Sequence, residues 1–209
     1  MSHIVFDGVD IVFGDARKRA LTLLDQGGTR EEILKATGAV IGVAGASLTV
    51  EDGEICVLMG LSGSGKSTLL RAVNGLNKVT RGKVMIKHRG DMVDIAKIDA
   101  NTLRTVRTES VAMVFQQFAL LPWRTVKDNV AFGLELKGMS KAERDVIVDE
   151  KLKMVQLDPW AHKYAHELSG GMQQRVGLAR AFATDASLLL MDEPFSALDP
   201  LIRTKLQDE

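Results

Sequence analysis

Cysteine pairs, an excess of charge of either sign and long hydrophobic runs are all missing from this chain, and each absence excludes a class of protein. The single cysteine, Cys56, has no partner within the chain, which suits a reducing compartment, and its apolar neighbours predict a small buried side chain. Lys plus Arg and Asp plus Glu each total 27, so the net charge of zero gives no electrostatic reason to expect a nucleic acid partner.

The apolar runs are too short for a membrane-spanning helix. Leu188 to Met191, one of the longest, is a small fraction of the roughly 20 residues that a span needs. The first residues, with Asp7 and Asp10 among the apolar ones, lack the basic-then-apolar order of a signal peptide. A membrane role would therefore require docking to another protein.

The glycines carry the first specific motif. Gly60 to Ser67, which reads GLSGSGKS, follows an apolar run from Ile55 to Met59 that predicts a buried strand, and it precedes residues with helical spacing. Strand, glycine-rich loop and helix in this order predict a phosphate-binding loop, because glycines let consecutive backbone N–H groups wrap around an anion. The alternative is a glycine-rich turn that contains a lysine by chance.

In such a loop the Lys66 ammonium reaches the β- and γ-phosphates, and the Ser67 hydroxyl ligates Mg²⁺. The predicted nucleotide contacts of the loop are Gly60, Ser62, Gly63, Ser64, Gly65, Lys66, Ser67 and Thr68. The motif therefore predicts that the chain binds a nucleoside triphosphate with Mg²⁺.

Helical segments interrupt a pattern of short strands. Residues 16–38 break the β pattern and predict two short helices, the second opened by a capping box of Thr29 and Glu32. Residues 117–168 show helical spacing between strands predicted at Val111 to Phe115 and Ser187 to Met191. The order of elements therefore predicts an α/β core with an inserted helical subdomain.

Two carboxylates, Asp192 and Glu193, follow the last predicted strand. A carboxylate at the C-terminal end of a strand can hold the Mg²⁺ shell, which fits Asp192, and Glu193 can polarise the attacking water as a general base. Apolar strands followed by acids are common, so the pattern depends for its meaning on the phosphate loop upstream.

A second anion site is predicted at Leu168 to Arg175, which reads LSGGMQQR. Ser169, Gly170 and Gly171 stand at a helix start, where free N–H groups favour an anion, although simple capping by Ser169 is the alternative. This stretch resembles the signature of ATP-binding cassette (ABC) ATPases. Met172 stands in place of the family's usual glutamine, and Gln173, the neighbouring candidate for the ribose contact, follows it.

The resemblance covers nearly the whole chain and implies roles for further residues. Gln116 looks like the Q-loop glutamine that senses Mg²⁺ and is one of its ligands, with Gln117 as the adjacent alternative. Asp199, in the stretch SALD, looks like the D-loop residue that lines the dimer interface. Phe13 stands where the family places an aromatic that stacks on adenine; the alternative is a core residue at a strand end.

The family's fold is an α/β P-loop NTPase (RecA-like) core with an antiparallel β subdomain and an inserted α-helical subdomain. The resemblance implies residues 1–116 and 187–209 for the core with its β subdomain, 16–38 for a helical insertion, 117–168 for the helical subdomain and 169–186 for the signature helix. The family's H-loop histidine lies beyond Glu209, so weak or absent turnover is expected of this chain. The chain's own histidines are expected to be surface or capping residues; they are His3, His88, His162 and His166.

The resemblance also implies a Mg-dependent ATPase in which two copies pack head to tail, each ATP lying between Gly60–Ser67 of one copy and Ser169–Gly171 of the other. The helical insertion and the run from Phe115 to Val126 look like the ATPase subunits of bacterial importers for quaternary amines such as choline and glycine betaine. The implied partners are a transmembrane permease and, indirectly, a periplasmic solute-binding protein, with the chain peripheral to the cytoplasmic face of the inner membrane.

Three other functions are compatible with parts of this sequence. They are an importer for another solute, a non-transport cassette ATPase in DNA repair or at the ribosome, and a P-loop kinase or GTPase. A kinase or GTPase would leave Leu168 to Arg175 without a purpose, and the sequence has neither the second cassette nor the basic surface that would favour a non-transport ATPase. Import of a quaternary amine is therefore the leading hypothesis.

Overall fold

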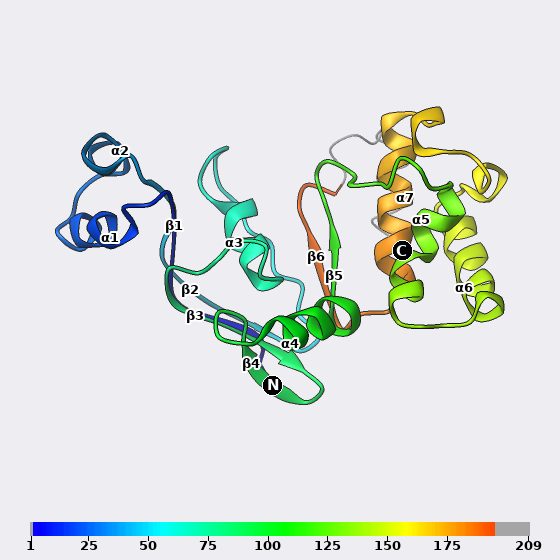
Figure 1. Cartoon of the computed structure of the whole chain (residues 1–209), viewed down its shortest axis with the longest axis horizontal. Coiled ribbons are helices and arrows are strands. Elements are labelled where there is room, and N and C mark those ends of the chain that lie inside the picture. Colours follow the sequence, from blue (N-terminus) through cyan, green and yellow to red (C-terminus); the bar gives the residue numbers. More distant parts are fainter. Residues whose placement is uncertain (1, 195–209) are drawn as a thin grey trace. The chain divides into compact units, whose positions relative to one another are not determined.

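The computed structural model describes residues 2–194, and the chain divides into two compact units, Met1–Val106 and Arg107–Glu209. The first unit contains a four-stranded antiparallel sheet in the order β2-β1-β3-β4 (Figure 1). Its strands are β1 (Ser2–Phe13), β2 (Val40–Glu51), β3 (Arg81–His88) and β4 (Asp91–Asp94). The predicted antiparallel β subdomain is therefore present in this unit.

Two helices, α1 (Arg17–Asp25) and α2 (Arg30–Thr37), lie within residues 16–38 and connect β1 to β2. The Thr29 side chain accepts from the Glu32 amide while the Glu32 carboxylate accepts from the Thr29 amide, so the predicted capping box is present. Buried apolar side chains join the two helices to the sheet; they are Val12, Ala20, Ile33, Ala39 and Ile41.

An arginine on β3 also ties α1 to the sheet. Arg81 donates from Nε to the buried Asp10 carboxylate at 2.5 Å and from both terminal nitrogens to Asp25 on α1, each at 2.8 Å. The hydrogen bonds from Arg81 hold the pKa of Asp25 below its ordinary value. The insertion is thus fixed to the sheet by both apolar packing and charge.

Three expectations for buried or surface residues are wrong in this structure. Residues 55–59 form no strand, and Ile55 and Met59 are 91% and 88% exposed. No described strand pairs with this segment, and without a ladder partner an apolar run has neither satisfied backbone groups nor a face to pack against. Cys56 lies within this segment and is exposed, not buried as predicted. His88, predicted to be a surface or capping residue, is buried, and its ring contacts the hydroxyl of Thr105 on α4 (Ala100–Thr105).

The second unit places helices beside a short parallel sheet (Figure 1). Strand β5 (Val111–Val114) pairs in parallel with β6 (Leu188–Met191), and both lie within stretches predicted to be strands. Helices α5 (Val126–Leu136), α6 (Lys141–Met154) and α7 (Gly170–Ala183) pack on one another, and short 3₁₀ turns cover Asp158–Trp160 and Ala165–Glu167. These helices and turns all lie between β5 and β6 in the chain.

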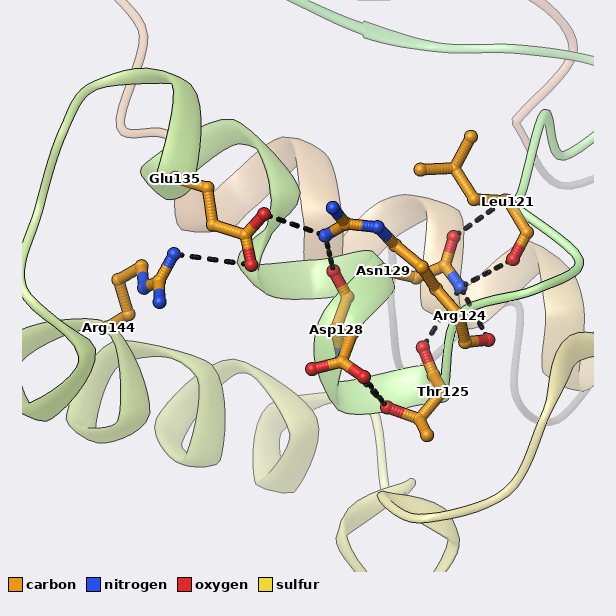
Figure 2. A network of polar contacts seen from close by, with 7 residues as sticks. All are labelled: Leu121, Arg124, Thr125, Asp128, Asn129, Glu135 and Arg144. Carbon is orange, nitrogen blue, oxygen red and sulfur yellow. Dashed lines mark hydrogen bonds and ion pairs between the residues drawn. The ribbon is translucent and has the colours of Figure 1, made fainter.

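A buried amide fixes the segment that leads from β5 into α5 (Figure 2). Asn129 on α5, only 1% exposed, accepts from the Leu121 amide and donates to the carbonyls of Leu121, Arg124 and Thr125. Glu135 accepts from Arg124 at 2.7 Å and lies 3.2 Å from Arg144 on α6. Residues 121–125 are therefore held by hydrogen bonds to side chains rather than by regular secondary structure.

Among the described residues, no helix is both long and apolar enough to cross a bilayer.

Candidate functional site

The phosphate loop lies in the first unit and opens helix α3 (Lys66–Val73). Gly65 precedes this helix with φ of +102°, and a Cβ there would overlap the carbonyl oxygen of Gly42 on β2, so only glycine fits. The sheet and the loop are thus in direct contact at Gly65, which fixes the start of the helix.

The loop closes on itself in this structure. The Lys66 ammonium donates to the carbonyls of Gly60 and Leu61 at 2.8 and 2.9 Å, and the Ser64 amide donates to the Leu61 carbonyl at 3.2 Å. Residues 61–64 are exposed, so these bonds form in contact with solvent. A phosphate can replace the carbonyls as the partner of Lys66, because a charged acceptor makes the stronger bond to an ammonium group.

Phe13 lies at the end of β1, beside the loop helix. Its ring is 40% exposed, and a Cβ at Gly42 would stand 2.7 Å from the Phe13 ring and 3.0 Å from the Thr68 methyl group. Because Gly42 has no side chain, Phe13 and Thr68 can both pack closely against its backbone. An exposed aromatic face beside a phosphate loop can stack on a base.

The candidate catalytic carboxylates lie in the second unit, at the carboxyl end of β6. The Asp192 amide donates to the Val114 carbonyl at 3.0 Å, which extends the pairing with β5 by one bond, and Asp192 is 4% exposed. The chain then turns at Glu193, whose φ is +50°. Gln116, just beyond β5, donates from Nε2 to the Glu193 carboxylate at 2.8 Å. The structure thus brings Gln116 and Glu193 together, as the parallel pairing of their strands requires.

The signature stretch forms the start of α7. Ser169 is the N-cap, and its hydroxyl accepts from the Met172 amide at 3.3 Å, so the capping interpretation is confirmed. Ser169 and Gly170 are exposed. The side chain of Gln173, the candidate for a ribose contact, donates to the Leu168 carbonyl at 3.1 Å. Met172 packs against the apolar core of the second unit. The helix tip therefore presents the small residues Ser169 and Gly170 to solvent.

Two polar residues on α7, the half-buried Arg180 and the buried Gln174, were missed in the sequence. Arg180 donates to the carbonyls of Phe118 and Ala119, just beyond Gln116, and burial lowers the pKa of its guanidinium. Gln174 is 1% exposed and donates to the Glu193 carbonyl. Gln174 shares a helical face with Leu178 and Ala181, so a glutamine within an apolar stripe was the available signal.

The predicted site residues are thus divided between the two units. Phe13 and Gly60–Thr68 belong to the first, and Gln116, Ser169–Gln173 and Asp192–Glu193 belong to the second. Asp199 lies outside the described residues. The first unit has a glycine-rich loop that opens a helix, and the second has acidic residues at the end of a parallel strand. Both features are typical of P-loop nucleotide-binding proteins.

Comparison with known proteins identifies the family. The family profile described as ABC transporter matches residues 43–196, and the chain belongs to this family. It is 56% identical over 198 residues to the glycine betaine/proline betaine transport system ATP-binding protein ProV of Escherichia coli (strain K12), covering 95% of this chain and 48% of ProV. The glycine betaine transport ATP-binding protein OpuAA of Bacillus subtilis (strain 168) is 52% identical over 206 residues, and the match covers 99% of this chain and 48% of OpuAA. The chain spans about half the length of these curated relatives.

Solved structures support the same assignment. One is the dimeric structure of an ATP-binding cassette in a post-hydrolysis state bound to ADP and Pi, with a TM-score of 0.82 and 31% sequence identity. The match covers 98% of this chain and 80% of the chain in that structure. The predicted fold class, an α/β P-loop NTPase with an antiparallel β subdomain and an inserted helical subdomain, is therefore confirmed.

Proposed function

We propose that this chain binds ATP with Mg²⁺ and hydrolyses it to energise import of a quaternary amine, such as choline or glycine betaine, across the bacterial inner membrane. The observation that carries the proposal is the phosphate loop, in which an ammonium group rests on two carbonyls that a triphosphate can replace. Identity of 52–56% to two glycine betaine transport proteins supports the solute class.

In this proposal Lys66 and the loop amides from Gly60 to Thr68 bind the phosphates, and Phe13 stacks on the adenine. The helix dipole of α3 adds a favourable field for the anion. Ligand binding then exchanges the bonds within the loop for bonds to phosphate.

The residues suit a magnesium ion, because a serine hydroxyl, a carboxylate and an amide oxygen are the hard ligands that Mg²⁺ prefers. We assign Ser67, Asp192 and Gln116 to these roles. The amide nitrogen of Gln116 donates to Glu193, so its oxygen is the atom suited to a metal. When bound, the ion neutralises charge on the phosphates.

Glu193 is the proposed general base. Its carboxylate accepts the proton of a water whose oxygen attacks the γ-phosphorus, while the bond from that phosphorus to the bridging oxygen breaks and ADP leaves. The hydrogen bond from Gln116 orients the carboxylate, and most of the rate comes from positioning and electrostatics.

The proposal includes a second copy of this chain. The helix tip at Ser169–Gly171 supplies amide donors for the triphosphate held by the partner copy's phosphate loop, with the D-loop residue Asp199 at the same interface. Closure and reopening of the dimer drive conformational changes in a membrane permease, and a periplasmic solute-binding protein delivers the solute to that permease. The chain is then a peripheral subunit on the cytoplasmic face.

Lys66→Ala tests the nucleotide site. Loss of a charge-assisted contact to phosphate should weaken ATP binding by at least about 100-fold in calorimetric titration. The free energy of unfolding should change by less than about 0.5 kcal/mol, because Lys66 bonds only to exposed loop carbonyls among the described residues.

Lys35→Ala is the matched control, since Lys35 is exposed on α2 and its side chain makes no hydrogen bond or ion pair with a described residue. It should bind ATP like the wild type. Near-normal affinity in Lys66→Ala would reject the assigned loop. The solute is tested separately, with the complete protein and its co-purified permease in vesicles, by stimulation of ATPase activity by choline or glycine betaine. An unstimulated rate would reject the solute class alone.

A further inference from the structure

The start of α7 and the candidate base are connected by one buried side chain. Gln174 lies four residues after Gly170, about 6 Å along the helix from the exposed tip. Its side chain is 1% exposed, and a primary amide so far from water requires hydrogen-bond partners. One partner is the backbone carbonyl of Glu193, 3.3 Å from Nε2.

The bond acts at a point where the backbone has left regular structure. Asp192 is the last residue to pair with β5, and Glu193 follows with a left-handed φ of +50°, a conformation that non-glycine residues adopt at a cost. Such a conformation persists where neighbouring groups hold it. The donor from Gln174 holds the main chain of Glu193, and the donor from Gln116 holds its carboxylate.

The two glutamines therefore restrain different parts of one residue. Gln116 fixes where the carboxylate oxygen lies, and Gln174 fixes the peptide from which that side chain projects. Without Gln174, Glu193 loses a hydrogen bond that restrains its backbone, and of these two donors only Gln116 would still orient the carboxylate. A general base displaced by about 1 Å is a poorer catalyst although the nucleotide remains bound.

We propose that Gln174 is a positioning residue for Glu193, and that α7 couples its Ser169–Gly171 tip to the position of the general base. The inference rests on the proposed ATPase function. Because tip and glutamine lie on consecutive turns of one rigid helix, a displacement of the tip by an anion or a second copy moves the donor that holds Glu193.

Gln174→Met tests the proposal, because methionine keeps the length and volume of the side chain and removes the donor. In the complete protein kcat for ATP hydrolysis should fall at least about 10-fold while KM for ATP changes less than about 2-fold, since the substitution acts on the base and not on the bound nucleotide. If this variant does not fold, Gln174→Asn keeps an amide and withdraws it by one methylene, with the same expectation.

A double-mutant cycle with Glu193→Gln separates positioning from general damage. Once the base is removed, adding Gln174→Met should lower the residual kcat by less than about 2-fold, because the restrained group is gone. Asn129→Ala removes another buried amide of the same unit that does not contact Glu193 and should leave kcat of the folded protein within about 2-fold.

A wild-type kcat in Gln174→Met, or a full 10-fold loss that persists in the Glu193→Gln background, would overturn the assignment of Gln174 and leave the ATPase proposal standing. Absence of ATP hydrolysis by the complete wild-type protein would overturn both.

Discussion

The phosphate loop and the region around the start of α7 hold their candidate nucleotide contacts in opposite ways. In the loop, Lys66 bonds to carbonyls of the loop itself, and residues 61–64 are exposed. Around α7, Glu193 receives donors from Gln116 and Gln174, and the tip rests on a large apolar core. The bonds of Lys66 therefore lie in contact with solvent, whereas the contacts of Glu193 include the buried side chain of Gln174.

The largest stability effect should come from the second unit, at the amide that fixes residues 121–125 (Figure 2). Asn129→Ala removes four hydrogen bonds and leaves the half-buried Leu121 amide and the carbonyls of Leu121, Arg124 and Thr125 without this partner. We expect the free energy of unfolding to fall by about 3 kcal/mol in urea denaturation. Asn101→Ala, on the exposed face of α4, should change it by less than about 0.5 kcal/mol. Equal losses at the two asparagines would remove the distinction between buried and exposed amides.

An intermediate effect is expected at the one loop position where the first unit is tightly packed. Gly65→Ala combines a φ of +102° with overlap against the Gly42 carbonyl, and should cost about 2 kcal/mol of stability and weaken ATP binding. Gly53→Ala is the control, with a φ of +77° and open space around it, and it should lose about 1 kcal/mol with unchanged ATP affinity. Normal ATP affinity in Gly65→Ala would show that the loop tolerates distortion at its contact with the sheet.

The smallest effect concerns pH and the turn that leads into the loop. The pKa of Asp52 is lowered to about 2, first by the hydrogen bond from Lys87 on β3 and then by that from His3 on β1. A lowered pKa stabilises the folded chain above the unfolded value of about 4, and this contribution is lost as the pH falls towards 2.

Asp52→Asn should therefore lower Tm at pH 5 to 7, and its difference from the wild type should shrink as the pH is lowered towards 2. Asp15→Asn, at an exposed carboxylate with no bond to a described residue, should follow the wild type at each pH. A difference between Asp52→Asn and the wild type that stays constant down to pH 2 would mean that the carboxylate's charge is not what ties the turn to the sheet.

Local patterns were sufficient where a short stretch satisfies its own backbone. The capping box of Thr29 and Glu32 and the cap at Ser169 are as predicted, because their donors and acceptors lie within four residues of one another. The strands predicted at Val111 to Phe115 and at Ser187 to Met191 are present as β5 and β6, each one residue shorter.

The same kind of pattern was wrong at residues 55–59, because an apolar run becomes a strand only where another strand pairs with it. The exposure of Cys56 and the burial of His88 depend on such partners too, and a window of sequence does not contain them. The assignments of Phe13, Lys66, Asp192 and Glu193 to roles in ATP binding and hydrolysis remain proposals.

The amino-acid sequence by itself determined the phosphate loop, the signature stretch and the family, because each consists of neighbouring residues whose spacing carries the chemistry. Only the tertiary structure decided which polar side chains are buried and what they hold. Gln174 meets Glu193 across 19 residues of chain, and Arg180 meets Phe118 across 62. Contacts of this kind arise when separate elements pack together, so the spacing of residues in the sequence does not reveal them.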